Sequence, residues 1–368
     1  MNLKLNYLCL DVTREGQASY THVHEIISGL RRRDIEVRLY QPYYVNRSES
    51  PKGIFRAIGI LACQIELLLQ LKDVDCIYIR SHFGAFFTTL MAKILHKPLI
   101  IEVNGPYEDL FIAWPLTAKF RALFEWLMRI QFIWADSLVT VTPELKEWLL
   151  LQGVKKKPVI IPNGVNIDIF RPGVPFGFQL PKPYVIFFGA LAAWQGIDTL
   201  LQAFESQLWP KNVYLVIVGD GKERSRVEEM AKRQTHLIYL GRVPYQVMPG
   251  LIGESLCAVS PKNNLGGRST TGLSPLKVYE TMACAIPIIV TDFPGQADLV
   301  RNCQCGIVVP PEDPEALASA VNQLVNMGED ERMEMGNRGR NFVEKYHSWD
   351  IRAGATYKLL EELCCGGK

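Results

Sequence analysis

The sequence predicts an α/β protein with two doubly wound domains, each built on a parallel sheet. Short strands rich in Val, Ile and Leu alternate with amphipathic helices along the whole chain, which is the pattern of βαβ units. The 368 residues suffice for two or three domains with separate cores. A segment dense in Pro and Gly, 162–183, divides the alternation into two series and marks the domain boundary.

The order of elements gives the domain limits. In the first series we expect strands at 3–10, 35–39, 76–79, 99–103, 137–141 and 159–161, with helices at 20–33, 54–71, 83–95, 116–134 and 143–151. The second series has strands at 184–188, 213–218, 237–240, 256–260 and 307–309, and a further strand at the end of the stretch 271–290. We assign 1–165 to an N-terminal domain, 166–183 to a linker, 184–346 to a C-terminal domain and 347–368 to a helix packing back toward the N-terminal domain.

Composition excludes several classes of protein. A hydrophobic content of 48% with 21% charged residues is typical of soluble globular proteins. The net charge of +2 gives no general argument for nucleic-acid binding, and the basic clusters 31–33 and 155–157 lie at a helix end or in a connection. The nine cysteines are odd in number and lack zinc-ligand spacing, which favours a reducing cytoplasmic compartment. No export signal is apparent, and polar residues interrupt the apolar stretch 54–71.

The strongest candidate site is a loop, helix and strand between 266 and 290. Ser274 and Pro275 predict a helix start, with Ser274 as the cap and Pro275 in the first turn. The small, donor-rich loop before them leads to a helix N-terminus, where an anion such as a diphosphate is favoured. Lys277 and Glu280 then share one helix face, with Glu280 available to accept from sugar hydroxyls. The alternative is a surface Lys/Glu pair on an ordinary helix.

Other candidates lie where strands end. Gly16 would let a ligand approach the backbone closely, although an ordinary turn would also explain a glycine there. His22 and His24 follow in the next helix, either as ligand contacts or as buried, hydrogen-bonded groups. Asn104 follows the strand 99–103, and Gly189 to Gly196 form the matching loop of the second domain. Because ligands bind at the carboxyl ends of parallel strands, we expect the site in the cleft between the domains. We find no dinucleotide fingerprint, Walker loop, nucleophile elbow or metal-binding helix.

Together these segments resemble family 4 of the retaining glycosyltransferases, which have the GT-B fold. The resemblance rests on Ile-Pro-Asn-Gly-Val-Asn at 161–166, Val-Ile-Val-Gly-Asp-Gly at 216–221, Leu-Gly-Arg-Val at 240–243 and Ser-Pro-Leu-Lys at 274–277 with Glu280. It implies a metal-independent enzyme without a cofactor, which transfers a sugar from a nucleotide-diphosphate sugar to a glycan, lipid-linked or small-molecule acceptor. Such an enzyme would act in the synthesis of cell-surface polysaccharide or glycoconjugates. Nucleic acid is not expected as a partner, because of the net charge given above.

The resemblance also implies roles for individual residues. Lys277 and Arg268 would hold the departing diphosphate together with the helix start at Ser274 and Leu276, and Glu280 would bind the ribose. The remaining implied positions are the donor-side residues Gly189 and Gln195 and the acceptor-side residues Gly16 and Asn104, of which Asn104 joins Lys277 as a catalytic candidate.

The chain departs from the family pattern at four positions. Gly272 stands where the family has a first glutamate, Ala190 and Gln195 stand where it has Arg and Lys, and Asn104 replaces a histidine found in many members. Lys277 is therefore expected to carry more of the charge neutralisation than in a typical relative. Two alternatives stay open, a nucleotide-sugar epimerase on the same fold and a catalytically silent sugar-nucleotide-binding protein.

The segment 111–134 is unusually aromatic. It begins at Phe111, and three tryptophans and three more phenylalanines follow between 114 and 134. Lys119, Arg121 and Arg129 are interspersed among them. We favour a helix half buried in the first domain, and the second interpretation is an interfacial helix in contact with a membrane. The expected location is the cytoplasm, either free or peripheral on the inner face of the cell membrane.

Overall fold

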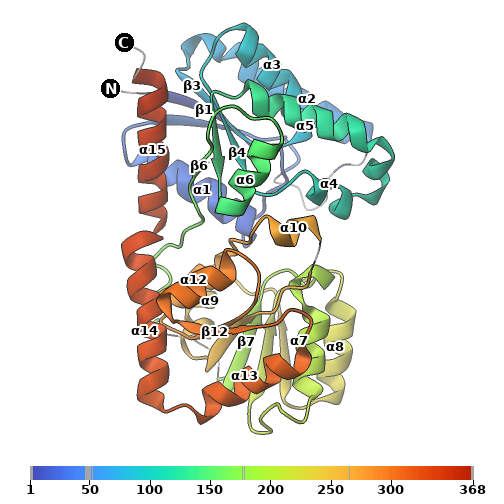
Figure 1. The fold of residues 1–368 in the computed structure, drawn as a ribbon, viewed down its shortest axis with the longest axis vertical. Coiled ribbons are helices and arrows are strands. Elements are labelled where there is room, and N and C mark those ends of the chain that lie inside the picture. The colour runs from blue at the N-terminus through green and yellow to red at the C-terminus, as the bar shows by residue number, and fades with distance from the viewer. Residues whose placement is uncertain are drawn as a thin grey trace. The chain divides into compact units, whose positions relative to one another are not determined.

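The computed structural model describes residues 3–45, 51, 53–175, 177, 179–264 and 266–365. The chain forms two compact units, the first from residues 1–162 and 349–368 and the second from 163–348. Each contains a six-stranded parallel sheet flanked by helices (Figure 1). The predicted α/β architecture with two parallel sheets is confirmed.

The first unit has the strand order β2-β1-β3-β4-β5-β6. Its strands are β1 (Lys4–Leu8), β2 (Glu36–Tyr40), β3 (Cys76–Arg80), β4 (Leu99–Val103), β5 (Ser137–Thr140) and β6 (Val159–Ile160). Its helices are α1 (Ala18–Arg31), α2 (Ile54–Leu69), α3 (Phe86–Ile94), α4 (Glu108–Ala113), α5 (Arg121–Trp134), α6 (Pro143–Leu151) and α15 (Trp349–Cys365). The central strands β3, β4 and β5 are almost entirely buried, in keeping with their largely apolar sequences.

The expected helix over 116–134 is shorter than predicted. Residues Pro115–Phe120 form a 3-10 helix, and α5 begins only at Arg121. None of the six residues in the 3-10 segment is buried, so no packed face holds them in α-helical geometry. Periodicity in the sequence does not distinguish such an exposed segment from the helix that follows it.

The helix α15 belongs to the first unit, where it packs along α1. A Cβ atom built on Gly29 would lie 2.3 Å from the Cβ of Ala353, so the contact between these helices requires glycine at this position. Arg33 adds hydrogen bonds of 2.9 Å to both carboxylate oxygens of Asp350. The first unit is therefore assembled from both ends of the described chain.

The second unit has the strand order β12-β11-β10-β7-β8-β9. Its strands are β7 (Tyr184–Phe188), β8 (Tyr214–Val218), β9 (Leu237–Gly241), β10 (Cys257–Ser260), β11 (Ile288–Thr291) and β12 (Gly306–Val309). Its helices are α7 (Ile197–Glu205), α8 (Arg224–Arg233), α9 (Met248–Gly253), α10 (Gly267–Thr270), α11 (Leu276–Ala283), α12 (Gln296–Cys303), α13 (Pro314–Asn326) and α14 (Glu329–Tyr346).

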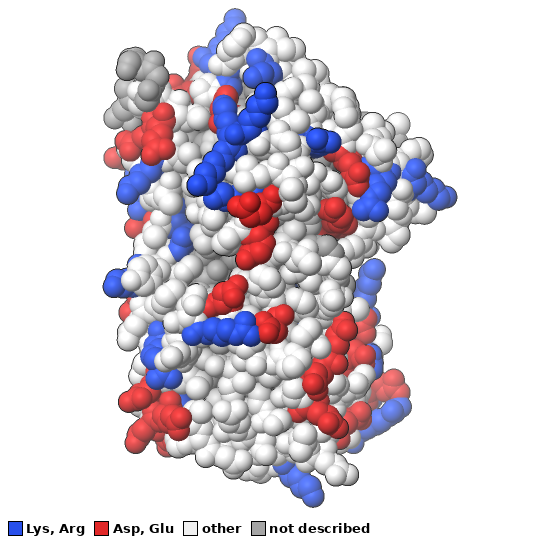
Figure 2. All heavy atoms as spheres, in the orientation of Figure 1, with Lys and Arg blue, Asp and Glu red and all other residues white. Residues whose placement is uncertain are grey.

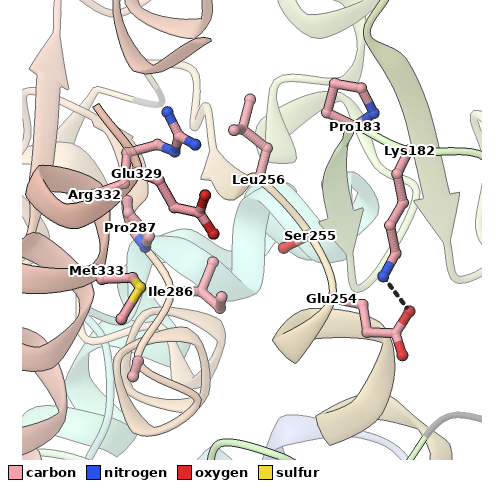
Figure 3. A pocket seen from close by; sticks show the side chains of 11 residues that line it. Lys182, Pro183, Glu254, Ser255, Leu256, Ile286, Pro287, Glu329, Arg332 and Met333 are labelled. Carbon is pink, nitrogen blue, oxygen red and sulfur yellow. Dashed lines mark ion pairs between the residues drawn. The ribbon is translucent and has the colours of Figure 1, made fainter. Parts of the chain in front are cut away.

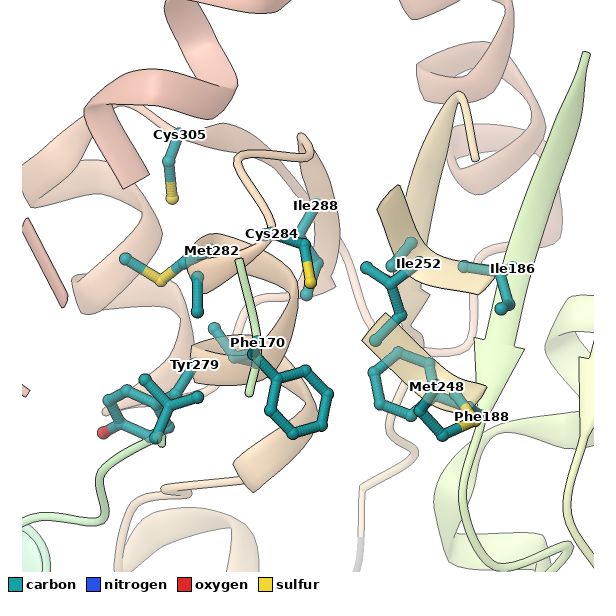
Figure 4. Packing of buried hydrophobic residues seen from close by; sticks show 14 of the residues in the cluster. Phe170, Ile186, Phe188, Met248, Ile252, Tyr279, Met282, Cys284, Ile288 and Cys305 are labelled. Carbon is teal, nitrogen blue, oxygen red and sulfur yellow. The ribbon is translucent and has the colours of Figure 1, made fainter. Parts of the chain in front are cut away.

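The helix α11 lies in the core of the second unit. Its Tyr279 and Met282 pack in one cluster with Phe170, Phe188 and Met248 (Figure 4). Every residue of α11 is buried, including Lys277 and Glu280. The alternative of a surface Lys/Glu pair on an ordinary helix is therefore wrong.

The predicted start of this helix needs correction. The helix begins at Leu276, Pro275 is its N-cap residue, and no side chain caps it. The Ser274 hydroxyl instead accepts the backbone N–H of Asn163 at 3.3 Å and shares a hydrogen bond of 2.9 Å with the Tyr279 hydroxyl. The Ser274 hydroxyl, which the sequence predicts as the helix cap, is thus hydrogen-bonded to Asn163 and Tyr279 instead. The N–H groups of the first turn of α11 therefore have no side-chain cap.

Candidate active site

The Lys277 ammonium group lies at the carboxyl end of β7. Its Nζ donates to Oε1 of Gln195 at 3.1 Å and lies 4.0 Å from the centre of the Phe187 ring. A Cβ atom built on Gly189 would approach the Nζ atom to 3.3 Å. Lys277, Gln195 and Gly189, which the sequence predicts for the donor side, lie together here. Phe187 was not predicted, because a phenylalanine within a strand looks like ordinary core.

Burial controls the charge of both titratable groups on α11. Burial lowers the pKa of Lys277 from 10.5 to about 7, against the attraction of Glu280. Burial also raises the pKa of Glu280 from 4.5 to about 7, although Tyr245 donates a hydrogen bond of 3.1 Å to its Oε1 and Lys277 is close. Near neutral pH each group thus has accessible charged and neutral forms, and a nearby anion would favour the charged lysine.

The loop after β7 and the loop after β10 pack closely against each other beside Lys277. Gly196 has a φ of +76°, and a Cβ atom there would lie 1.5 Å from the Pro261 carbonyl oxygen, so only glycine permits the approach. Asn263 donates from its amide to the Ala193 carbonyl at 3.2 Å and accepts from the Thr199 hydroxyl at 3.1 Å. The loop after β10 therefore fixes the short 3-10 segment that carries Gln195.

Lys262 is a second buried cation in this region and was not predicted from the sequence. It follows β10 closely, its side chain is buried, and its Nζ lies 4.3 Å from the centre of the Trp194 ring. The signal available in the sequence was a lysine two residues beyond a buried strand, in Ser-Pro-Lys. Because β10 pairs with β7 in the sheet, Lys262 and Lys277 lie at the same edge.

The remaining donor-side candidates are placed as follows. Ser274 and Leu276 lie at the start of α11, and Leu276 is buried. Arg268 belongs to α10, but its side chain lies outside the described residues. Gly272 has a φ of +79°, a conformation that is costly for other residues, so the backbone there suits glycine rather than the glutamate of the family pattern. Ala190 is exposed and carries no charge.

In the first unit, Asn104 belongs to a buried network centred on Glu102. The Tyr78 hydroxyl donates to Oε2 of Glu102 at 2.7 Å, and Arg80 donates to Oε1 at 2.8 Å. Nε2 of His22 lies 2.8 Å from the same Oε1, and the Asn104 amide also donates to it. Asn104 was predicted from the sequence as a site residue, and His22 was considered either as a ligand contact or as a buried, hydrogen-bonded group. No role was predicted for Glu102, the single charged residue in β4.

The network keeps the Glu102 carboxyl group in its charged form inside the first unit. Burial by itself would raise the pKa of Glu102, but His22, Arg80 and the Asn104 hydrogen bond outweigh it and hold the pKa well below its usual range. The Trp349 ring of α15 contacts the His22 ring edge-on at 5.3 Å between centres. Asn104 is thus fixed by a carboxylate, while Gly16 lies in an exposed loop where an added Cβ atom would meet nothing within 4 Å.

A cavity of about 450 Å³ lies elsewhere in the second unit. Pro183, Leu256 and Pro287 line it, each directly preceding a strand of the sheet, and Lys182 forms an ion pair of 2.8 Å with Glu254 at one side (Figure 3). The cavity therefore lies at the amino ends of β7, β10 and β11, opposite the edge that carries Lys277. It is not the candidate active site.

Within the described residues, no group of three or more His, Cys, Asp or Glu side chains has a geometry suited to a metal ion. Among those same residues, the helices are all too short or too polar to cross a membrane.

In the comparison with known proteins, both halves of the chain match models of glycosyltransferase families. Residues 20–169 match the family model "Glycosyltransferase Family 4", and residues 174–342 match "Glycosyl transferases group 1". An uncharacterized glycosyltransferase of Methanocaldococcus jannaschii is 25% identical over 357 residues, which cover 93% of each chain. A D-inositol 3-phosphate glycosyltransferase of Corynebacterium jeikeium is 26% identical over 55% of this chain and 51% of its own.

Solved structures show the same fold. Sucrose-phosphate synthase of Thermosynechococcus elongatus superimposes with a TM-score of 0.80 at 15% identity, covering 99% of this chain and 100% of the other. HepE of Anabaena in complex with UDP superimposes with a TM-score of 0.73 at 15% identity, covering 98% of this chain and 100% of the other. Both likenesses concern the fold, and they confirm the expected GT-B class.

Proposed function

On the premise that the chain is a GT-B-type glycosyltransferase, with a family 4 domain followed by a group 1 domain, we propose that it transfers a sugar from a nucleotide-diphosphate sugar with retention of anomeric configuration. The observation that carries the proposal is the buried Lys277 at the carboxyl edge of β7, held by Gln195 and Phe187. An ammonium group in a site of low polarity is a strong partner for an anion.

The reaction breaks the bond between the anomeric carbon of the sugar and the terminal phosphate oxygen, and joins that carbon to a hydroxyl oxygen of the acceptor, whose proton passes to the departing phosphate. The electron pair of that bond stays with the diphosphate, whose negative charge rises as the bond breaks. Lys277 neutralises this charge, and the backbone N–H groups at the very start of α11, beginning with Leu276, add aligned donors. Protein cations replace a metal ion in this scheme, with Lys262 at the same edge and Arg268 on α10 as further candidates.

Glu280 is assigned to the ribose. Its carboxyl group lies one turn beyond Lys277 on α11 and is buried, so a hydroxyl pair that replaces water would form strong hydrogen bonds to it. The Tyr245 hydroxyl occupies one lone pair of Oε1 and fixes the orientation of the group. A donor that binds here would encounter both functional side chains of α11 together.

The acceptor is assigned to the first unit, at Asn104 and the Gly16 loop. The Glu102 network fixes the amide of Asn104 so that its orientation does not depend on the substrate. An amide can donate to and accept from sugar hydroxyls, which suits a glycan or lipid-linked sugar acceptor in the synthesis of a surface polysaccharide or glycoconjugate.

A thermal-shift screen against nucleotide sugars identifies the donor, because a ligand far above its dissociation constant stabilises the folded state. With that donor, the test is Lys277→Ala, with Lys232→Ala on the exposed side of α8 as the matched control. We expect the Lys277 variant to melt like the wild type and to lose most nucleotide release, while the control keeps it. Wild-type turnover in Lys277→Ala refutes the assignment.

The same assay distinguishes the two alternatives. Conversion of the donor sugar without any acceptor identifies an epimerase. Donor binding by the wild type without nucleotide release, whatever acceptor is added, identifies a silent binding protein.

A further inference from the structure

Asn163, in the Ile-Pro-Asn-Gly-Val-Asn motif, is the residue at which the chain enters the second unit. It forms two hydrogen bonds with Ser274, which lies 111 residues further along the chain. Its backbone N–H donates to the Ser274 hydroxyl at 3.3 Å, and its side-chain amide donates to the Ser274 carbonyl oxygen at 2.6 Å. One asparagine thus holds both the side chain and the main chain of Ser274.

Ser274 lies just before the helix α11. Its carbonyl oxygen belongs to the peptide bond with Pro275, which is the N-cap residue, and α11 begins at Leu276. Because the proline ring fixes φ, only the ψ angle of Pro275 remains between the plane of this peptide and the N–H group of Leu276. The Asn163 amide holds that plane by its carbonyl oxygen. The direction of the first N–H groups of α11 therefore depends on Asn163.

The preceding residue is held by a different part of the second unit. The backbone N–H of Leu273 donates to the Pro294 carbonyl oxygen at 2.8 Å. A Cβ atom built on Gly295 would lie 2.4 Å from the Leu273 carbonyl oxygen, so this loop packs directly against residue 273. The loop before α11 is therefore fixed at two successive residues, and Asn163 supplies the second of these contacts.

The Ser274 hydroxyl also connects α11 to the segment at which the chain leaves the second unit. It shares a hydrogen bond of 2.9 Å with the Tyr279 hydroxyl, and the centres of the Tyr279 and His347 rings are 5.1 Å apart. The His347 carbonyl oxygen accepts from the backbone N–H of Val165 at 2.9 Å. These contacts lead back to the motif that contains Asn163, so they form a closed series around the first turns of α11.

We propose that Asn163 is a positioning residue for the diphosphate site at the start of α11. It acts through Ser274 rather than on the donor itself, by fixing the peptide plane that directs the N–H groups of Leu276 and Lys277. The inference rests on the proposed function, which assigns the diphosphate to this helix start. Donors that stabilise a developing charge must already be in place when the bond breaks, so a loosened helix start costs reaction rate more than donor binding.

Two variants of Asn163 test this role. Asn163→Ala removes the side-chain hydrogen bond and keeps the backbone one. We expect kcat to fall at least about thirtyfold, while the dissociation constant of the nucleoside diphosphate changes by less than about threefold. Asn163→Asp is nearly isosteric, but an ionised carboxylate cannot donate to the Ser274 carbonyl oxygen, so its kcat should fall as far. The Asp variant carries the test if the Ala variant does not fold.

The matched control is Asn166→Ala in the same motif. Asn166 is half-buried like Asn163, and its carboxamide oxygen accepts from the backbone N–H groups of Asp168 and Ile169 at 3.2 Å each. The control therefore also removes hydrogen bonds from this segment, but those bonds do not lead to Ser274. Its kcat should stay within about twofold of the wild type, even where its melting temperature falls as far as that of Asn163→Ala.

Salt dependence separates a short-range contact from a change in the field of the surface. Figure 2 shows acidic and basic side chains where Figure 1 places α8 and α14 of the second unit, and interactions among such exposed charges are screened by salt. The contact between Asn163 and Ser274 involves no charged group. The loss of kcat in Asn163→Ala should therefore be the same at about 0.05 M and about 0.5 M salt.

Nucleotide release by the wild type, and its loss in Lys277→Ala, test the proposed function separately. Where both are observed, three results overturn the positioning role alone. They are a wild-type kcat in Asn163→Ala, recovery of kcat in Asn163→Asp, and an equal loss of kcat in Asn166→Ala at a comparable melting temperature. A wild type that releases no nucleotide from any donor removes the proposed function and this inference together.

Discussion

Replacing Glu280 by glutamine should change the pH dependence of stability in a defined direction. The carboxyl group has a pKa of about 7 in the folded protein and 4.5 as its ordinary value, because burial disfavours its charged form. The folded state therefore binds a proton between these values that the unfolded state has released. The resulting stabilisation is complete below pH 4.5 and is lost as the pH rises through 7.

The size of the effect follows from the shift. A pKa difference between 4.5 and about 7 corresponds to on the order of 3 kcal/mol, at about 1.4 kcal/mol per unit. The free energy of unfolding of the wild type, minus that of Glu280→Gln, should fall by about this amount between pH 4.5 and pH 7.5. Loss of the Glu280 charge also lowers the pKa of Lys277 further, which makes the variant gain stability with pH and reinforces the same trend.

Urea denaturation of both proteins at several pH values, followed by circular dichroism, measures this difference. The same substitution at the exposed Glu229 of α8 supplies the baseline. A difference for Glu280 that stays flat between pH 5 and pH 7, or that rises, would show that the carboxyl group is not held in a desolvated site. The interpretation of α11 as a buried, poised pair of titratable groups would then be wrong.

Three further outcomes are expected. Binding of a nucleoside diphosphate at pH 8 should take up protons, because the anion restores the charge of Lys277; calorimetry in buffers of different ionisation enthalpy measures this, and equal uptake by Lys277→Met contradicts it. Gly189→Ala should lower kcat/KM at least about tenfold, since its φ is +133° and the added Cβ atom would crowd Nζ of Lys277 at 3.3 Å, and unaltered kinetics oppose this account. Glu102→Gln should cost about 3 kcal/mol, because it removes the carboxylate that His22 and Arg80 share and leaves Arg80 with Asp11 at its other side, so an unchanged melting temperature rules out a structural role for the network.

The sequence was sufficient for the fold because the fold depends on local patterns. The alternation of buried strands and amphipathic helices can be recognised within windows of a few residues, and it predicts parallel sheets by itself. Prediction from the sequence was less accurate at the ends of helices, as at the start of α11. The Ser274 hydroxyl has a partner 111 residues away, in Asn163, and no local pattern shows that it is unavailable as a helix cap.

The candidate site was predictable only in part, for the same reason. Lys277 and Glu280 lie one turn apart, so helix periodicity brings them together, but their burial depends on how the whole second unit packs around α11. The Glu102 network depends on the register of two strands, which places Arg80 beside Glu102, and on a histidine from α1. Such contacts between distant residues are fixed by tertiary structure, which periodicity does not encode.

The return of α15 to the first unit has a consequence for synthesis of the chain. Residues 1–162 lack the helix that covers Gly29 and His22 until 349–365 have left the ribosome, by which time all of 163–348 has been made. The second unit can therefore complete its fold first, although it is encoded later. A break after Ser348 would leave the second unit whole and expose the apolar side of α1, so degradation should begin in the first unit rather than at the cut end.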